Sequence, residues 1–256
     1  MKHVPFLLRP VGKDYLWGGE RLKTEYHKQI DLTPLAETWE CSTHPDGCSI
    51  VDSGAAAGKP LRTVLQEHPE YLGIYANSEG ELPILIKLID AKKDLSVQVH
   101  PDDAYAKQYE NGQNGKTEMW YVLEAEPDAS LVYGFQHTMT PERLRQSLAE
   151  GTLEADLQSV PVSKNDAFLI PAGTVHAIGA GILLAEIQQS SNLTYRLYDY
   201  NRTDANGNKR PLHIEKAVAT VDYQQKPLPE QNRTVEQKDG YTEEVLCACP
   251  YFQVSR

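Results

Sequence analysis

Two polar side chains stand two residues apart at the end of an apolar stretch, within LSVQVHPDDAYA (95–106). Residues two apart in a strand point to the same face, so Gln98 and His100 lie together while the flanking valines face the other side. Pro101 cannot donate a hydrogen bond to a sheet, so we expect the strand to end just past His100. An amide and an imidazole at a strand end can together bind a polar ligand or a metal ion.

Two later segments add further ligand-type side chains. GKTEMWYVL places Lys116 and Glu118 two apart at the entry to another strand, and IPAGTVHAIG places His176 just after a turn. With the first pair, the carboxylate of Glu118 and the imidazole of His176 make a four-ligand set that suits zinc and leaves positions for water or substrate. Spacing alone leaves the ordinary alternative open, in which each residue is a hydrogen-bonded or exposed polar side chain.

The elements that carry these residues are mostly predicted strands. Apolar runs separated by Gly, Pro and Asn predict strands over 83–91, 95–99, 118–125, 130–135, 166–171, 181–189, 193–200 and 243–249. Helical spacing predicts helices over 61–68, 102–109, 140–151 and 213–221. Many short strands with few helices predict a mainly β protein, a sandwich or barrel with a few peripheral helices.

The composition is that of a folded protein and excludes several classes of function. The chain has 256 residues, of which 40% are hydrophobic and 24% charged, and its formal net charge is −11. An acidic chain does not suit nucleic acid, and no apolar run reaches the roughly 18 residues of a membrane span. The N-terminus lacks the apolar region of a signal peptide, and four cysteines are too few for a disulfide scaffold. We therefore expect a cytoplasmic protein.

The chain divides into three predicted parts. Residues 1–223 form the metal-binding core with its short helices, and the polar, proline-containing segment 224–240 is a predicted linker. Residues 241–256 begin a C-terminal β region. Since a lone hairpin is marginal in water, we expect this part either to pack on the core or to belong to a truncated region.

Several long motifs give the chain a family resemblance. They are DYLWGGERL, AETWECSTHPDGCSIV, SVQVHPDDAYA, GKTEMWYVL, IPAGTVHAIGAGILLAEIQQSSNLTYRLYDYNR and KRPLHIEKA, in this order. From about residue 5 to 222 the chain resembles the type I mannose-6-phosphate isomerases of the short bacterial form. The resemblance implies a cupin fold, a jelly roll of two stacked sheets with one zinc ion per chain at the barrel mouth. The zinc ligands that it implies are Gln98, His100, Glu118 and His176.

The resemblance also implies how a sugar phosphate is handled. Mannose 6-phosphate and fructose 6-phosphate interconvert by moving a proton between C2 and C1 through an enediol, which needs a base. The family places Glu186 and Arg196 in the cleft, and Lys116 shares a face with Glu118. Residue type alone leaves the base open between Glu186 and Lys116. We expect Arg196 either to stabilise the enediolate or to bind the phosphate. Residues predicted as a local basic cluster for the phosphate are Arg202, Lys209 and Arg210.

The sequence leaves two alternatives to an active isomerase. One is a non-catalytic cupin that binds a sugar or sugar phosphate, or a truncated and inactive isomerase. The other is a cupin metalloenzyme of another class, such as an iron oxygenase, against which Gln98 in place of a third histidine argues. An intact Lys116, Arg196 and Glu186 favour the isomerase, because a mere binder has little need of a base beside a metal. The oligomeric state cannot be predicted from the sequence.

Overall fold

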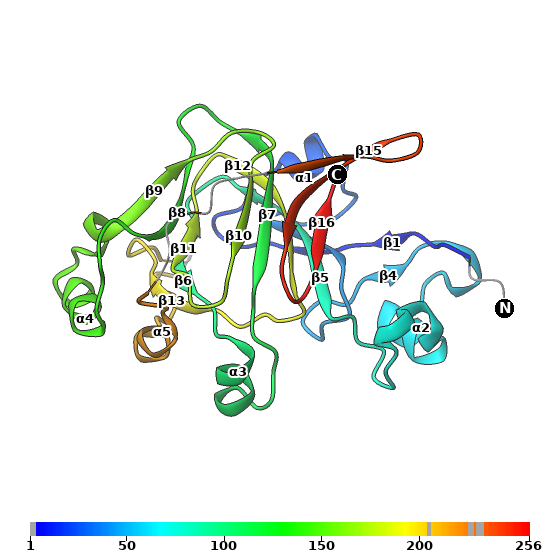
Figure 1. The fold of residues 1–256 in the computed structure, drawn as a ribbon, viewed down its shortest axis with the longest axis horizontal. Coiled ribbons are helices and arrows are strands. Elements are labelled where there is room, and N and C mark those ends of the chain that lie inside the picture. The colour runs from blue at the N-terminus through cyan, green and yellow to red at the C-terminus, as the bar shows by residue number, and fades with distance from the viewer. Residues whose placement is uncertain (1–3, 204–205, 225–227, 229–232) are drawn as a thin grey trace.

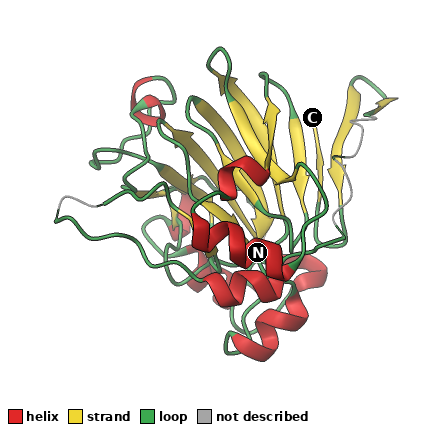
Figure 2. Ribbon diagram, turned by 90° about the vertical axis from the view of Figure 1, so that its left-hand side faces the viewer, coloured by secondary structure: helices red, strands yellow, loops and turns green. Residues whose placement is uncertain are grey.

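Strands dominate the molecule and stack as two facing sheets, with most helices beyond one end of the sandwich (Figures 1 and 2). The structure is a computed structural model that describes residues 4–203, 206–224, 228 and 233–256. The prediction of a mainly β fold with a few peripheral helices is confirmed.

The larger sheet has six antiparallel strands in the order β10-β7-β12-β5-β3-β2. Their bounds are β10 (Ala167–Ile170), β7 (Glu118–Ala125), β12 (Ile182–Gln189), β5 (Ile84–Ala91), β3 (Glu37–Cys41) and β2 (Val11–Lys13). The three long strands in its middle come from the apolar runs of the sequence, because a strand covered on both faces needs apolar side chains on both.

The second sheet has five antiparallel strands in the order β13-β6-β11-β8-β9. Their bounds are β13 (Tyr195–Tyr198), β6 (Val97–Val99), β11 (His176–Ile178), β8 (Ser130–Phe135) and β9 (Leu157–Pro161). One buried cluster joins Trp120 and Val122 of the larger sheet to Leu131 and Ile178 of this one. The two inner faces therefore share a single core, which is the jelly-roll arrangement expected from the sequence.

The helices lie outside this sandwich and match the four predicted from helical spacing, apart from the short α1. Their bounds are α1 (Arg21–Thr24), α2 (Leu61–Glu67), α3 (Asp103–Tyr109), α4 (Pro141–Glu150) and α5 (Ile214–Thr220), with 3-10 turns η1 (Gly54–Ala56), η2 (Pro69–Tyr75) and η3 (Leu153–Asp156). Thr140 caps α4 by accepting from the Arg143 amide at 3.2 Å, and Gly151 ends it with φ 71°. No helix in the described part of the chain is long and apolar enough to span a membrane.

Two further groups of strands lie beside the sandwich. The short strands β1 (Leu8–Arg9) and β4 (Ile50–Val51) pair with each other, and β14 (Thr234–Gln237), β15 (Thr242–Ala248) and β16 (Gln253–Ser255) form a C-terminal sheet. Part of the segment predicted as a linker, 234–237, is thus a strand, and residues 225–227 and 229–232 of it lie outside the described residues.

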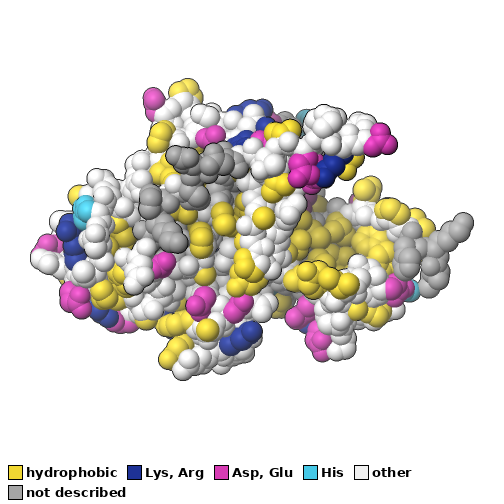
Figure 3. Space-filling view, viewed as in Figure 1, with side chains coloured by type: hydrophobic (Ala, Val, Ile, Leu, Met, Phe, Trp, Pro, Cys, Tyr) yellow, Lys and Arg dark blue, Asp and Glu magenta, His cyan; other side chains and the backbone are white. Residues whose placement is uncertain are grey.

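The C-terminal sheet contacts the core of the molecule. Strand β15 contacts β10, and the Arg256 guanidinium donates to the Tyr121 hydroxyl at 2.9 Å. The Tyr251 hydroxyl donates to the Asp103 carboxylate at 3.0 Å. Hydrophobic side chains gather on the same face of the molecule between β16 and α2 (Figure 3).

Asp156 fastens α4 to the sandwich and gives a test of stability. Its buried carboxylate accepts hydrogen bonds from the Ser147 hydroxyl at 2.5 Å and from the Arg143 guanidinium at 2.7 Å. The same carboxylate lies 2.7 Å from His137 Nε2. The Arg143 and His137 side chains are half exposed, but removing the carboxylate leaves the buried Ser147 hydroxyl without its partner. We expect Asp156→Ala to lower the free energy of unfolding by about 2 kcal/mol in urea titrations.

The matched control is Glu215→Ala. Glu215 of α5 pairs with Arg145 of α4 at 3.0 Å, but both side chains are exposed. An exposed pair contributes little, so this variant is expected to unfold close to wild type. Equal losses in the two variants would contradict the role given to Asp156.

Candidate metal centre and cleft

Three strands bring two imidazoles and a carboxylate to one point between the sheets. His100 directly follows β6, and His176 opens the neighbouring β11, where it pairs in register with Gln98. Glu118 opens β7 of the opposite sheet. The strand alternation inferred from the sequence therefore places Gln98 and His100 on the inner face, as expected.

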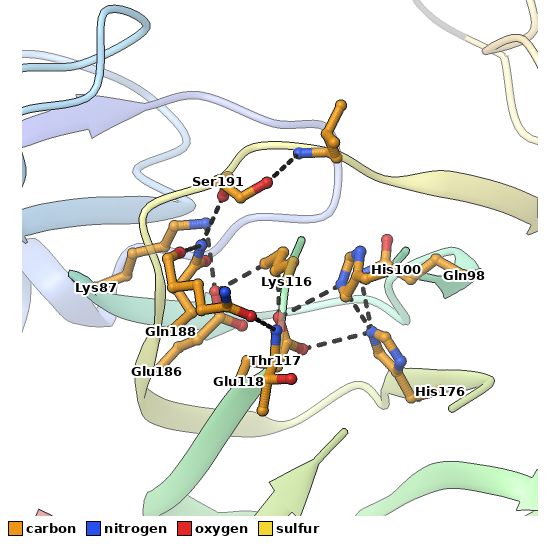
Figure 4. Close-up of polar contacts among 12 residues, drawn as sticks. Lys87, Gln98, His100, Lys116, Thr117, Glu118, His176, Glu186, Gln188 and Ser191 are labelled. Carbon is orange, nitrogen blue, oxygen red and sulfur yellow. Dashed lines mark hydrogen bonds and ion pairs between the residues drawn. The ribbon is translucent and has the colours of Figure 1, made fainter. Parts of the chain in front are cut away.

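The three side chains are buried and close enough to hold one ion (Figure 4). The Nε2 atoms of His100 and His176 lie 3.1 Å apart. The Glu118 oxygens lie 3.3 Å from His100 Nε2 and 3.4 Å from His176 Nε2. Each residue offers one ligand atom, and these atoms all lie within 4.8 Å of one another.

The donor atoms have the protonation that a metal requires. His176 Nδ1 donates to the Thr174 carbonyl at 2.8 Å, which turns the lone pair of its Nε2 toward Glu118. Burial, helped by the Lys116 ammonium, lowers the pKa of His100 to about 3, so its ring is neutral. Burial opposes the charge on Glu118, yet Lys116 and His100 hold its pKa well below the usual range.

Glu118 gives the test of whether a metal fits. Neither of its buried oxygens accepts a hydrogen bond in good geometry from the described residues, although Lys116 Nζ forms an ion pair with one of them at 2.9 Å. Lys116 lies to one side of this carboxylate, and the close approach of carboxylate oxygens to the lone pairs of two neutral imidazoles is costly unless a cation lies among them. The described residues therefore fit a divalent cation, for which nitrogen and carboxylate ligands are suited.

Gln98 lies at the edge of this triad. Its Nε2 is 3.4 Å from His176 Nε2, and its Oε1 is 3.4 Å from the Ser96 hydroxyl. The structure thus brings together all four residues that the resemblance implies as ligands.

A second cluster of buried charges adjoins the triad. Lys116 Nζ lies 2.9 Å from the Glu118 carboxylate and 3.9 Å from that of Glu186. Lys87 Nζ lies 3.3 Å from Glu186 and 3.6 Å from Glu37. Acidic and basic groups therefore alternate from Glu37 to the candidate metal ligand Glu118, and Figure 4 shows this arrangement from Lys87 onward.

Strand register explains how this cluster forms. Lys87 of β5 pairs directly with Glu186 of β12, and Glu186 pairs on its other side with Trp120 of β7. The Trp120 indole donates to Glu186 at 3.0 Å, and the Trp39 indole donates to Glu37 at 2.7 Å. Burial, reinforced by the charge of Glu118, raises the pKa of Glu186.

Sequence reasoning missed Lys87 and Glu37. A signal existed for the lysine, because it is the single charge in the apolar run ILIKLI. A charge in the middle of a strand that is covered on both faces must have buried partners. Burial disfavours its ammonium, but Glu37 and Glu186 outweigh this and raise the pKa of Lys87.

A cleft of about 280 Å³ opens beside the triad and is lined by side chains of both sheets. Among those lining it are Gln98, Lys116, Glu186, Arg196 and Arg210. Arg196 pairs in register with Gln98, which in turn pairs with His176, so the three lie in one row across β13, β6 and β11.

The predicted basic cluster divides into two groups. Arg210 lines the cleft, while Arg202 and Lys209 are absent from the described residues that line it. Arg202 bonds to Asp199 at 2.5 Å, and the exposed Lys209 donates to Asn201 at 2.9 Å.

Comparisons with known proteins agree with this geometry. The family model for the catalytic domain of phosphomannose isomerase type I matches residues 6–130. The chain is 44% identical over 218 residues to GmuF of Bacillus subtilis strain 168, described as a probable mannose-6-phosphate isomerase, covering 85% of this chain and 68% of that protein. It is 40% identical to the mannose-6-phosphate isomerase ManA of the same organism, covering 100% of this chain and 80% of that protein.

A solved structure extends the similarity to the fold. The crystal structure of the mannose 6-phosphate isomerase from Bacillus subtilis superimposes with a TM-score of 0.92 at 36% identity. The match covers 99% of this chain and 79% of that one.

Proposed function

Because the chain belongs to the type I phosphomannose isomerase family, we propose that it interconverts mannose 6-phosphate and fructose 6-phosphate in the cleft between its two sheets. The observation that carries this proposal is the buried His100–Glu118–His176 triad with a second buried carboxylate, Glu186, beside it. Carbon-bound proton transfer needs both an electrophile and a base at one place.

We propose one zinc ion per chain, held by Gln98, His100, Glu118 and His176. Rotation of the Gln98 amide would present its oxygen in place of the nitrogen that now faces His176. When bound, zinc supplies a Lewis acid that stabilises the negative charge developing on the substrate oxygens.

The chain's own charges favour Glu186 as the base. Its Oε1 lacks a hydrogen-bond donor in good geometry among the described residues, whereas Trp120 fixes its Oε2. Lys116 Nζ instead pairs with the candidate metal ligand Glu118 at 2.9 Å and lies farther from Glu186, at 3.9 Å. Lys116 then serves as a fixed positive charge beside the developing enediolate.

A small-molecule enzyme of the cytoplasm fits the remaining features. The chain is acidic, with a net charge of −11, and its four cysteines are free thiols. The non-catalytic alternative is not favoured, because burying Glu186 and two lysines has a cost that mere binding does not require.

Chelation followed by zinc return tests the proposal. Proton NMR of mannose 6-phosphate in D2O is expected to show fructose 6-phosphate forming, with deuterium entering at C1 or C2. A chelator should reduce the rate by about 10³-fold or more, since a Lewis acid supplies several kcal/mol, and added zinc should restore it. Turnover that is indifferent to complete metal removal, or no turnover with zinc present, would refute the metal-dependent isomerase.

A further inference from the structure

Asp199, directly after β13, is held by two arginines. Its side chain is 5% exposed, and its carboxylate accepts from Arg210 Nη2 at 2.6 Å and Arg210 Nε at 2.8 Å. The same carboxylate accepts from Arg202 Nη2 at 2.5 Å. The paired bonds to Arg210 fix the plane of that guanidinium, and its Nη1 makes no hydrogen bond with the residues that the structure describes.

The charges at this wall of the cleft do not balance. Arg196 also lines the cleft, where it donates to the Ser96 hydroxyl at 3.2 Å and to the Pro211 carbonyl at 2.9 Å, both neutral groups. Among the contacts of the described residues, Arg202 and Arg210 share the carboxylate of Asp199, whereas Arg196 contacts neutral groups. Positive charge is thus in excess among the described residues of this wall, in a chain whose net charge is −11. Burial and the nearby Arg210 lower the pKa of Arg196.

The distance between this wall and the metal triad suits the two ends of one small molecule. Ser96, Gln98 and His100 alternate along one face at and beside β6, so each step spans about 7 Å and the row about 13 Å. Arg196 contacts Ser96 at one end of the row, His100 of the triad stands at the other end, and His176 lies opposite Gln98 in the middle. A six-carbon sugar phosphate with its carbonyl at the triad would bring its phosphate to the arginines.

We propose that Asp199 is a positioning residue that fixes Arg210 beside Arg196, so that these two guanidiniums receive the substrate's dianionic phosphate. This inference rests on the proposed function. Arg202 bonds to Asp199 from outside the cleft. In this proposal neither Arg202 nor Lys209 contacts the phosphate. Of the three residues predicted from the sequence to bind the phosphate, this proposal keeps Arg210 and adds Arg196.

The test compares Asp199→Asn with Arg202→Gln in the zinc-loaded protein. Asparagine keeps the shape of the side chain but loses the charge that orients Arg210. We expect the KM for mannose 6-phosphate to rise at least tenfold, with kcat within about threefold of wild type. The Kd of inorganic phosphate, measured by titration calorimetry, should weaken by a similar factor while zinc content stays unchanged. Arg202→Gln leaves the two hydrogen bonds between Arg210 and Asp199 intact, so the KM of this variant should change less than threefold.

A second variant keeps the test decisive if Asp199→Asn does not fold. Arg210→Lys retains the positive charge but cannot form the two parallel hydrogen bonds to Asp199. This variant should therefore raise both KM and the phosphate Kd. Unchanged phosphate binding in the folded variants, or a fall in kcat at constant KM, would overturn the positioning role. If wild type binds phosphate but does not isomerise the sugar, weaker phosphate binding in Asp199→Asn supports this inference while the proposed function fails.

Discussion

Replacing His176 by alanine is expected to remove the metal and turnover together. His176 is fully buried, its Nδ1 is fixed by the Thr174 carbonyl, and its Nε2 faces both His100 and Glu118. Without this ring the triad loses one of two nitrogen ligands, and no other described side chain of the cluster can replace it. The substrate oxygens would then lose several kcal/mol of charge stabilisation, which corresponds to a fall in kcat of about 10³-fold or more.

The measurement pairs zinc content by mass spectrometry with the rate of isomerisation. His68→Ala is the matched control, because His68 lies in the N-terminal region, where it contacts Glu70 and the ring of Tyr71. It should keep one zinc per chain and full activity. Full activity with undiminished zinc in the His176 variant would show that the assigned site is wrong.

Local rules predicted much of this site. The face shared by Gln98 and His100 follows from strand alternation, and the end of the strand follows from Pro101. The same alternation joined Lys116 to Glu118. These relations involve neighbours in sequence, so an ordinary strand pattern was sufficient. The helix from 140 to 151 was equally local, because Thr140 and Gly151 mark its ends.

Pairings between distant strands could not be read in the same way. That Lys87 meets Glu186 depends on the register of β5 against β12, about 100 positions apart in the chain. The paired hydrogen bonds between Asp199 and Arg210 depend on how the chain turns back after β13. Short strands such as β3 and β9 were also missed, because their few apolar residues give no periodic signal. Register and loop closure are set by the whole core and leave little trace in a local window.

Glu186→Gln is expected to lower kcat by about 10²- to 10⁴-fold while leaving zinc in place. Glutamine keeps the size of the side chain and an oxygen for the Trp120 indole, but it cannot accept a proton from carbon. Exchange of the C2 hydrogen with D2O should fall in parallel with kcat. The proton NMR assay in D2O measures both rates, and zinc analysis confirms that the metal site is intact.

Lys116→Arg separates the two candidates for the base. Arginine cannot give up its proton in a protein, yet it retains a positive charge near Glu118. If Lys116 acts as a fixed charge, this variant keeps measurable turnover and C2 exchange, whereas Lys116→Met loses far more. If Lys116 is the base, both variants lose exchange completely and Glu186→Gln retains it. The first result is the expected one, because Lys116 Nζ pairs with the candidate metal ligand Glu118 at 2.9 Å, whereas Glu186 has a carboxylate oxygen without a hydrogen bond in good geometry among the described residues.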